Sequence, residues 1–112
     1  MILLVEDDED VRDMLAFAFR SHGLVAHAVS NGTDALASLA QAQPCLVVLD
    51  LVMPGMTGWQ VVEEMKARGF AAPVCVISAG GDAPSWAVAS FCKPFDVREL
   101  ARVAARYCSH AP

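Results

Sequence analysis

Short unbroken runs of apolar residues recur along the chain, and between them apolar residues are spaced three or four positions apart. The unbroken runs predict buried strands at residues 2–5, 24–28, 45–49, 74–78 and 89–92. The spaced stretches predict four helices. One spans residues 8–22, the second ends at about Gln41, the third spans 58–68, and the fourth begins at a cap at Asp96. Apolar strands that alternate with helices are typical of a parallel sheet covered on both faces. The sequence therefore predicts a doubly wound α/β fold, as a single domain over residues 1–112.

Glycine and proline mark where the helices should end. Gly23 and Gly69 should close the first and third helices, and Pro44 should break the second, which Ser30 or Thr33 would cap. The residues expected to face the core are Val11, Met14, Leu15, Ala18, Leu36, Leu39, Ala40, Val61, Val62, Met65, Val97, Leu100, Val103, Ala104 and Tyr107. His22 falls on the same helical face as the first four, at the end of the helix.

Composition excludes several classes of function. Hydrophobic residues make up 55% of the chain, yet no window of eighteen residues lacks charges and turn signals, so no membrane span is predicted. The first residues lack the basic start of a secretory signal, and a cytoplasmic location is expected. The net charge is −5 without a Lys/Arg cluster, which argues against nucleic-acid binding.

The cysteines and histidines are not spaced in the sequence as metal ligands usually are. We interpret Cys45, Cys75, Cys92 and Cys108 as buried free thiols in a reducing cytosol, because a disulfide framework or zinc site usually shows closer spacing. The histidines, His22, His27 and His110, are expected at the surface.

Polar side chains follow the predicted strands at one edge of the sheet. Glu6 and Asp7 follow the first strand and Asp50 follows the third, so the three carboxylates should converge, because ligand sites lie at the carboxyl ends of parallel strands. Carboxylates this close repel one another unless a cation compensates, and Mg²⁺ is the cation that oxygen ligands favour. Aspartate can act as a nucleophile toward phosphoryl groups.

Two further strand ends complete this pattern. Ser78 offers a hydroxyl to a phosphoryl oxygen, and Lys93 offers a fixed positive charge. Less specific interpretations remain for each residue. The acids after the first strand could simply start a helix, Asp50 could form a turn, Ser78 could bond local backbone, and Lys93 could extend along the surface. The shared position at strand ends favours the phosphoryl site.

The chain resembles the receiver domain of two-component response regulators. The resemblance rests on ILLVEDD at residues 2–8, LDLVMPGMTG at 49–58, ISA at 77–79 and KPF at 93–95. It implies a flavodoxin-like fold with strand order 2-1-3-4-5, and phosphotransfer to Asp50 from a histidine kinase or histidine phosphotransfer protein. It also implies Mg²⁺ bound by Glu6, Asp7, Asp50 and the backbone carbonyl of Val52, with Ser78 and Lys93 on the phosphoryl group. A cis Lys93–Pro94 bond would fit the family.

The same resemblance implies a signalling domain rather than an enzyme. No DNA-binding or catalytic segment follows Tyr107 in this sequence, so we expect a monomer or weak dimer that signals to a downstream protein target by contacts. Met1 directly before the first strand suggests that little is missing there, although the sequence leaves open whether this is a fragment.

The sequence departs from the family pattern in two places. The segment from Ser78 to Lys93 is about seven residues short and contains two glycines and a proline, so the fourth helix should be missing or very short. Ser90 stands where the family usually has an aromatic switch residue, and the neighbouring Phe91 should face the other side of the sheet. Trp86 is expected to fill the gap, and Trp59 to be partly exposed.

These departures keep two other functions open. One is a phosphorylation-independent adaptor on the same fold, which would have no need of the acidic pocket. The other is a phosphatase of the haloacid dehalogenase type. That class needs a second aspartate two residues after the nucleophile, where this chain has Val52.

Overall fold

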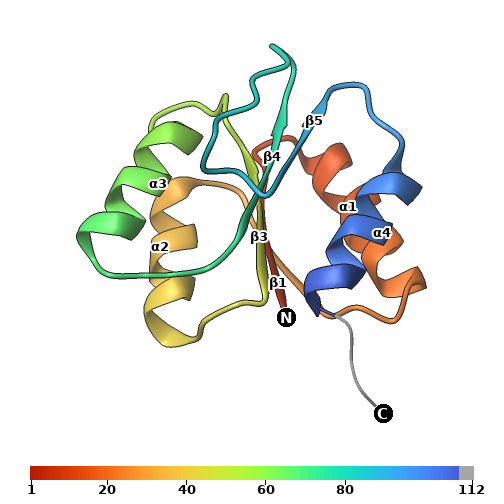
Figure 1. Ribbon diagram of the computed structural model, residues 1–112, viewed down its shortest axis with the longest axis horizontal. Coiled ribbons are helices and arrows are strands. Elements are labelled where there is room, and N and C mark those ends of the chain that lie inside the picture. The colour runs from red at the N-terminus through yellow and green to blue at the C-terminus, as the bar shows by residue number, and fades with distance from the viewer. Residues whose placement is uncertain (109–112) are drawn as a thin grey trace.

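Five parallel strands form one sheet in the order β2-β1-β3-β4-β5 in the computed structural model, which describes residues 1–108 (Figure 1). The elements are β1 (Ile2–Val5), α1 (Glu9–Ser21), β2 (Ala26–Val29), α2 (Gly32–Gln41), β3 (Leu46–Asp50), α3 (Gly58–Ala67), β4 (Val74–Ser78), β5 (Ala89–Cys92) and α4 (Val97–Cys108). The predicted fold class and strand order are confirmed. The prediction for His110 lies outside the described residues.

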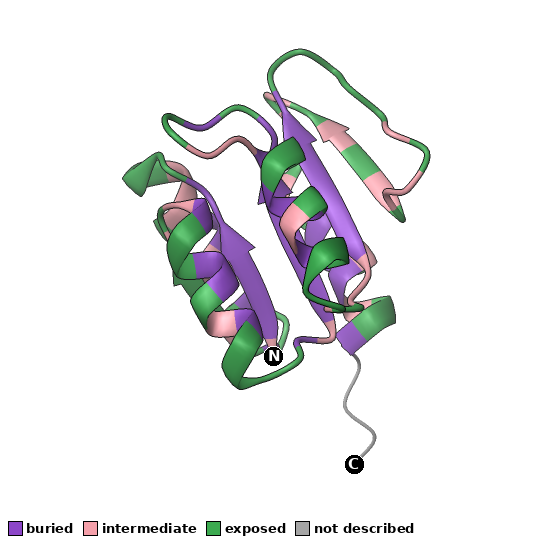
Figure 2. Cartoon of the chain, turned by 90° about the vertical axis from the view of Figure 1, so that its left-hand side faces the viewer, coloured by how far each residue is buried: buried purple, intermediate pink, exposed green. Residues whose placement is uncertain are grey.

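Helices cover both faces of the sheet, with α2 and α3 on one side and α1 and α4 on the other (Figure 1). Successive strand residues point to opposite faces, so each strand contributes to two cores. In β1, Leu3 and Val5 pack toward α2 and α3, whereas Ile2 and Leu4 pack toward α1 and α4. The central strands β1, β3 and β4 are buried throughout, whereas β5 forms a partly exposed edge (Figure 2). Two-sided burial explains why β1, β3 and β4 are almost entirely apolar.

No helix connects β4 to β5 within the described residues, as the glycines and proline predict. Residues 79–88 instead form an irregular connection with turns at 79–80 and 85–86, and Trp86 packs against the core beneath α2 and α3. The Trp86 ring meets that of Trp59, at the start of α3, edge to face with centroids 5.7 Å apart. Ser90 is exposed, and Phe91 packs on the opposite face of the sheet, as predicted.

The predicted helix ends are mostly confirmed, with one different cap. Gly23 and Gly69 follow α1 and α3 with positive φ angles, which glycine adopts without steric cost. The cap of α2 is Asn31 rather than Ser30 or Thr33, because the Asn31 side chain accepts the Asp34 N–H.

Three residues expected to face the core are exposed instead. These residues are Met14, Ala40 and Tyr107. Phe19, which lies one turn beyond Leu15 on α1 and was not among the expected core residues, is fully buried. The spacing of apolar residues therefore predicted the buried face of α1 approximately. The centre of that face, at Leu15 and Phe19, lies about one residue further along the helix than predicted.

A close approach between α3 and β3 requires glycine at position 58. A side-chain carbon added to Gly58 would lie 2.5 Å from the backbone oxygen of Asp50 and 2.7 Å from the Cα of Leu51. The Gly58 N–H also donates to the Leu51 carbonyl at 3.1 Å. This contact holds the loop after Asp50 against the start of α3.

The prediction of four free thiols is wrong for two of them. Cys45, just before β3, and Cys108, at the end of α4, form a disulfide with Cα atoms 5.4 Å apart. The partners are 63 residues apart in sequence, so their pairing depends on how α4 packs across the sheet and leaves no local spacing signal. Cys75 is a buried free thiol, as predicted, whereas Cys92 is free but exposed. His22 and His27 are exposed, as predicted.

Alkylation should distinguish these cysteines. At pH 8, iodoacetamide is expected to modify Cys92 in the native protein but not Cys75, because burial raises the pKa of the Cys75 thiol to about 12. Cys75 should react only after unfolding, and Cys45 and Cys108 only after reduction as well. Intact-mass measurement of the three samples provides the count. More than one adduct on the native, unreduced chain would contradict this assignment.

Of the helices within residues 1–108, none combines the length and apolar composition that a membrane crossing requires.

Candidate functional site

Asp50 ends β3 and lies almost completely buried beside a second carboxylate. The preceding residue, Leu49, pairs with Val5 of β1, so Asp50 lies next to Glu6 in the register of the two strands. The side chains of Asp50 and Glu6 are both at most 3% exposed. Burial of ionised carboxylates is costly without a partner. Lys93, which directly follows β5, supplies that partner.

The Lys93 ammonium bridges the two carboxylates. Its Nζ lies 2.7 Å from Glu6 Oε1 and 3.1 Å from Asp50 Oδ2. Within residues 1–108 no other cation pairs with either group. The peptide bond that follows, Lys93–Pro94, is cis, as predicted. The end of β5 therefore contributes the positive charge of a three-residue ionic cluster formed by Glu6, Asp50 and Lys93.

The cluster raises the pKa values of both Glu6 and Lys93. Burial and the hydrogen bond with Asp50 together raise the pKa of Glu6 to about 7, although the bond from Lys93 opposes the rise. Burial alone would lower the pKa of Lys93, but its bonds to Glu6 and Asp50 raise the net value. The cluster thus has one cation facing two carboxylates, and the Glu6 carboxyl binds a proton at a higher pH than an ordinary glutamate does.

Asp7 extends the cluster toward solvent. One carboxylate oxygen from each of Glu6, Asp7 and Asp50 lies within 4.8 Å of the others. Glu6 and Asp50 are buried and Asp7 is exposed, so the group is open on one side. Oxygen ligands in this number and at this spacing suit a hard divalent cation. The residues present therefore fit the magnesium ion that the sequence predicts.

The loop after Asp50 orients its carboxylate. The Val52 N–H donates to Asp50 Oδ1 at 3.0 Å, and the Leu51 N–H donates to the Ile77 carbonyl at 3.2 Å. The other Asp50 oxygen, Oδ2, receives the Lys93 bond. Both oxygens are therefore held, one by backbone and one by a side chain.

Ser78 ends β4 with a fully buried side chain. It lies one residue beyond Ile77, which is the register partner of Asp50. Its hydroxyl donates to Asp82 Oδ2 at 3.2 Å and accepts the Gly80 N–H at 3.2 Å. Ser78 is therefore at the predicted edge of the sheet, and its hydroxyl is engaged by the segment that follows it.

Two contacts of this site were not predicted from the sequence. One is the bond from Ser78 to Asp82, for which the only signal was an acid four residues after the strand end. The other comes from Arg12 on α1, whose guanidinium donates to the backbone carbonyls of Glu6 and Asp7 at 3.0 and 3.3 Å. Arg12 lies one turn after the Asp8 cap and fixes the backbone between β1 and α1.

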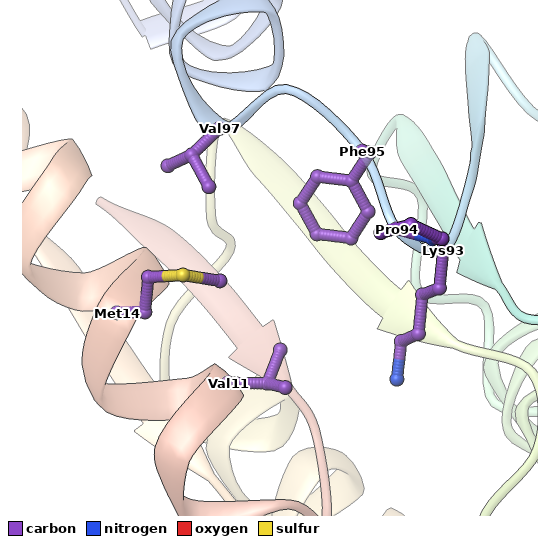
Figure 3. Close-up of a pocket in the computed structure, with 6 residues that line it drawn as sticks. All are labelled: Val11, Met14, Lys93, Pro94, Phe95 and Val97. Atoms are coloured by element: carbon purple, nitrogen blue, oxygen red, sulfur yellow. The ribbon is translucent and has the colours of Figure 1, made fainter.

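An apolar hollow of about 440 Å³ lies beside Lys93, between α1 and the start of α4 (Figure 3). The residues that line it are Val11, Met14, Lys93, Pro94, Phe95 and Val97. Met14 is 46% exposed, so this part of α1 presents an apolar surface to solvent next to the ionic cluster.

The comparisons with known proteins agree with this geometry. The family model of the response regulator receiver domain matches residues 2–104. The regulatory protein AtoC of Escherichia coli is 35% identical over 106 residues, which cover 88% of this chain and 23% of AtoC. The chain thus spans about a quarter of the length of that relative.

Solved structures show the same fold. The receiver domain of NtrX from Brucella abortus is 29% identical with a TM-score of 0.85, over 99% of this chain and 100% of that one. The response regulator TrrA from Thermotoga maritima, in complex with Mg²⁺ and BeF, is 28% identical with a TM-score of 0.81, over 95% of this chain and 96% of that one. The chain therefore belongs to the response regulator receiver domain family.

Proposed function

We propose that this chain is a phosphoacceptor that takes a phosphoryl group onto Asp50 from a phosphohistidine of a histidine kinase or histidine phosphotransfer protein. The observation that carries the proposal is the buried Asp50 carboxylate, held by Lys93 and the Val52 N–H beside the acids Glu6 and Asp7. A structural carboxylate has no need of two further acids at the same strand edge.

The reaction would form an acyl phosphate on Asp50. A carboxylate oxygen attacks phosphorus, the P–N bond of the phosphohistidine breaks, and its electron pair remains on the imidazole nitrogen. Asp50 Oδ1 accepts a hydrogen bond from the Val52 N–H, and Oδ2 accepts one from Lys93, so the carboxylate is held in one orientation. A fixed orientation lowers the entropic part of the barrier.

Glu6, Asp7, Asp50 and the Val52 backbone carbonyl are the residues that would hold Mg²⁺. When bound, this ion neutralises negative charge on the phosphoryl oxygens. The exposed position of Asp7 leaves the group accessible to an incoming phosphoryl donor.

Lys93 and Ser78 would bind the transferred group. Lys93 Nζ, now 3.1 Å from Asp50 Oδ2, is within reach of a phosphoryl oxygen attached to that carboxylate. The Ser78 hydroxyl would donate to another phosphoryl oxygen. The apolar hollow beside Lys93 supports a protein as the donor, because it offers a surface for docking next to the reacting atoms.

Magnesium-dependent labelling by acetyl phosphate tests the proposal. Transfer from this small donor breaks its P–O bond, and acetate leaves with the electron pair. The expected result is a mass gain of one phosphoryl group in the presence of Mg²⁺, absent with a chelator and removed by hydroxylamine, which cleaves acyl phosphates. Equal labelling with and without chelator would contradict the assigned metal site.

A phosphorylation-independent adaptor is the second candidate. The observation that favours it is the β4–β5 connection, which lacks a helix and leaves Ser90 exposed where the family usually carries a switch aromatic. The same labelling experiment decides between the two, because an adaptor would show no acyl phosphate at any Mg²⁺ concentration.

A further inference from the structure

The hydroxyl of Ser78 is already engaged in this structure. A serine hydroxyl carries one proton and so can donate to one acceptor at a time. That proton goes to Asp82 Oδ2 at 3.2 Å, while the Ser78 oxygen accepts the Gly80 N–H at 3.2 Å. A phosphoryl group on Asp50 can receive the Ser78 hydroxyl only if the bond to Asp82 breaks.

The Asp82 carboxylate occupies the space above Gly80. A side-chain carbon added to Gly80 would meet Asp82 Oδ2 at 3.1 Å and Ser78 Oγ at 3.7 Å. The glycine therefore leaves room for an acid next to the hydroxyl. The Asp82 carboxylate is negatively charged, as is a phosphoryl group, which carries a charge of about −1.5 to −2 at neutral pH.

The segment that carries Asp82 is anchored at both ends. At the start, the Lys93 N–H donates to the Ser78 carbonyl at 2.9 Å. At the far end, the Val88 N–H donates to the Val74 carbonyl at 2.9 Å, and Trp86 packs against Trp59. Between these anchors, residues 79–85 include two glycines, of which Gly81 has a positive φ angle. A change at Ser78 is thus connected through a short turn to the tryptophan pair.

We propose that Asp82 is a positioning residue that holds the Ser78 hydroxyl while Asp50 is unmodified and releases it when a phosphoryl group arrives. The inference rests on the proposed function. Release has two causes, competition for the single proton of Ser78 and repulsion between the Asp82 carboxylate and the phosphoryl group. The segment from Ala79 to Trp86 then adopts a second arrangement, which gives this chain a response to phosphorylation at the place where the connecting helix is absent.

Beryllofluoride with Mg²⁺, a mimic of the phosphoryl group, tests this inference in the intact chain. Tryptophan fluorescence is the readout, because Trp86 lies in the responding segment and its partner Trp59 lies outside it. Asp82→Ala is expected to bind beryllofluoride about threefold to tenfold more tightly than the wild type, which is the range for losing one competing hydrogen bond. The fluorescence of the unliganded variant should shift toward the bound value. Trp86→Phe should remove the signal.

Two further variants separate the causes. Asp82→Asn keeps an acceptor but removes the charge, so an affinity between those of the wild type and Asp82→Ala is expected. In a Ser78→Ala background the effect of Asp82→Ala should shrink, because only charge repulsion remains. Asp13→Ala, an exposed acid on α1, is the matched control and should leave the affinity unchanged.

The outcomes distinguish this inference from the function on which it rests. A wild type that binds beryllofluoride, with an Asp82→Ala variant that binds equally or more weakly, overturns the role of Asp82 alone. A wild type that neither binds beryllofluoride nor accepts phosphoryl from acetyl phosphate overturns both.

Discussion

Replacing Asp50 with asparagine is expected to reduce labelling by acetyl phosphate below detection. The amide has no ionised oxygen that could attack phosphorus, so no acyl phosphate can form at this position. The substitution keeps nearly the same shape, and the amide oxygen can still accept a bond from Lys93 or from the Val52 N–H. The loss should therefore reflect chemistry rather than misfolding. Intact-mass measurement after incubation with acetyl phosphate and Mg²⁺ records the result.

A matched acid variant controls for this effect. Asp13→Asn removes an exposed carboxylate from α1 and should label as completely as the wild type. Circular dichroism of both variants should be unchanged. Labelling of Asp50→Asn at the level of the wild type would mean that another residue accepts the phosphoryl group, and the proposed role of Asp50 would fall.

Replacing Lys93 with methionine is expected to lower the free energy of unfolding of the metal-free protein by about 2–3 kcal/mol at pH 8. Loss of one partner from a buried ion pair typically costs about 3–5 kcal/mol. The Lys93 side chain is 24% exposed, so solvent already screens part of its interaction with Glu6 and Asp50, and we expect less than the full range. Urea unfolding in the presence of a chelator measures the difference.

The loss of stability caused by Lys93→Met should decrease as the pH falls. Glu6 has a pKa of about 7 in the folded chain and 4.5 as a reference, so the folded state gains stability as the pH falls from 7 to 4.5. At pH 5 the Glu6 carboxyl is largely neutral in both proteins, and only the bond from Lys93 to Asp50 is lost. The difference between wild type and variant should therefore be smaller at pH 5 than at pH 8.

Metal and a second lysine provide the controls for this prediction. Mg²⁺ should restore part of the stability of Lys93→Met, because a bound cation compensates Glu6 and Asp50. Lys66→Met, on the exposed face of α3, should change the stability by less than about 0.5 kcal/mol. Equal effects at the two lysines would show that Lys93 does not stabilise the ionic cluster.

Much of this site was predictable because it depends on local patterns and on one rule of parallel sheets. An apolar run such as residues 45–49 can be satisfied only by burial on both faces, so β3 and its end at Asp50 follow from the sequence. Carboxyl ends of parallel strands meet at one edge, which brings Glu6, Asp50, Ser78 and Lys93 together. The short link after Ser78, with its glycines and proline, predicted the missing helix for the same local reason.

Apart from the cap of α2, the errors concern how elements far apart in the chain pack together. Cys45 and Cys108 form a disulfide because α4 crosses back over the start of β3, and no spacing in the sequence records that approach. Tyr107 and Ala40 lie on predicted apolar faces, yet both are exposed. Such contacts depend on the angles at which elements pack, which periodicity does not specify.

The sequence by itself determined the elements, the fold class and the residues of the acidic edge, because periodicity and strand ends are local properties of the chain. Only the tertiary structure decided how these residues share their charges and protons. It placed Lys93 on both Glu6 and Asp50, and it engaged the Ser78 hydroxyl with Asp82. The Lys93 pairings join the ends of separate strands and the Ser78 pairing closes a short turn, and all of them depend on distances of about 3 Å, which local patterns in the sequence do not specify.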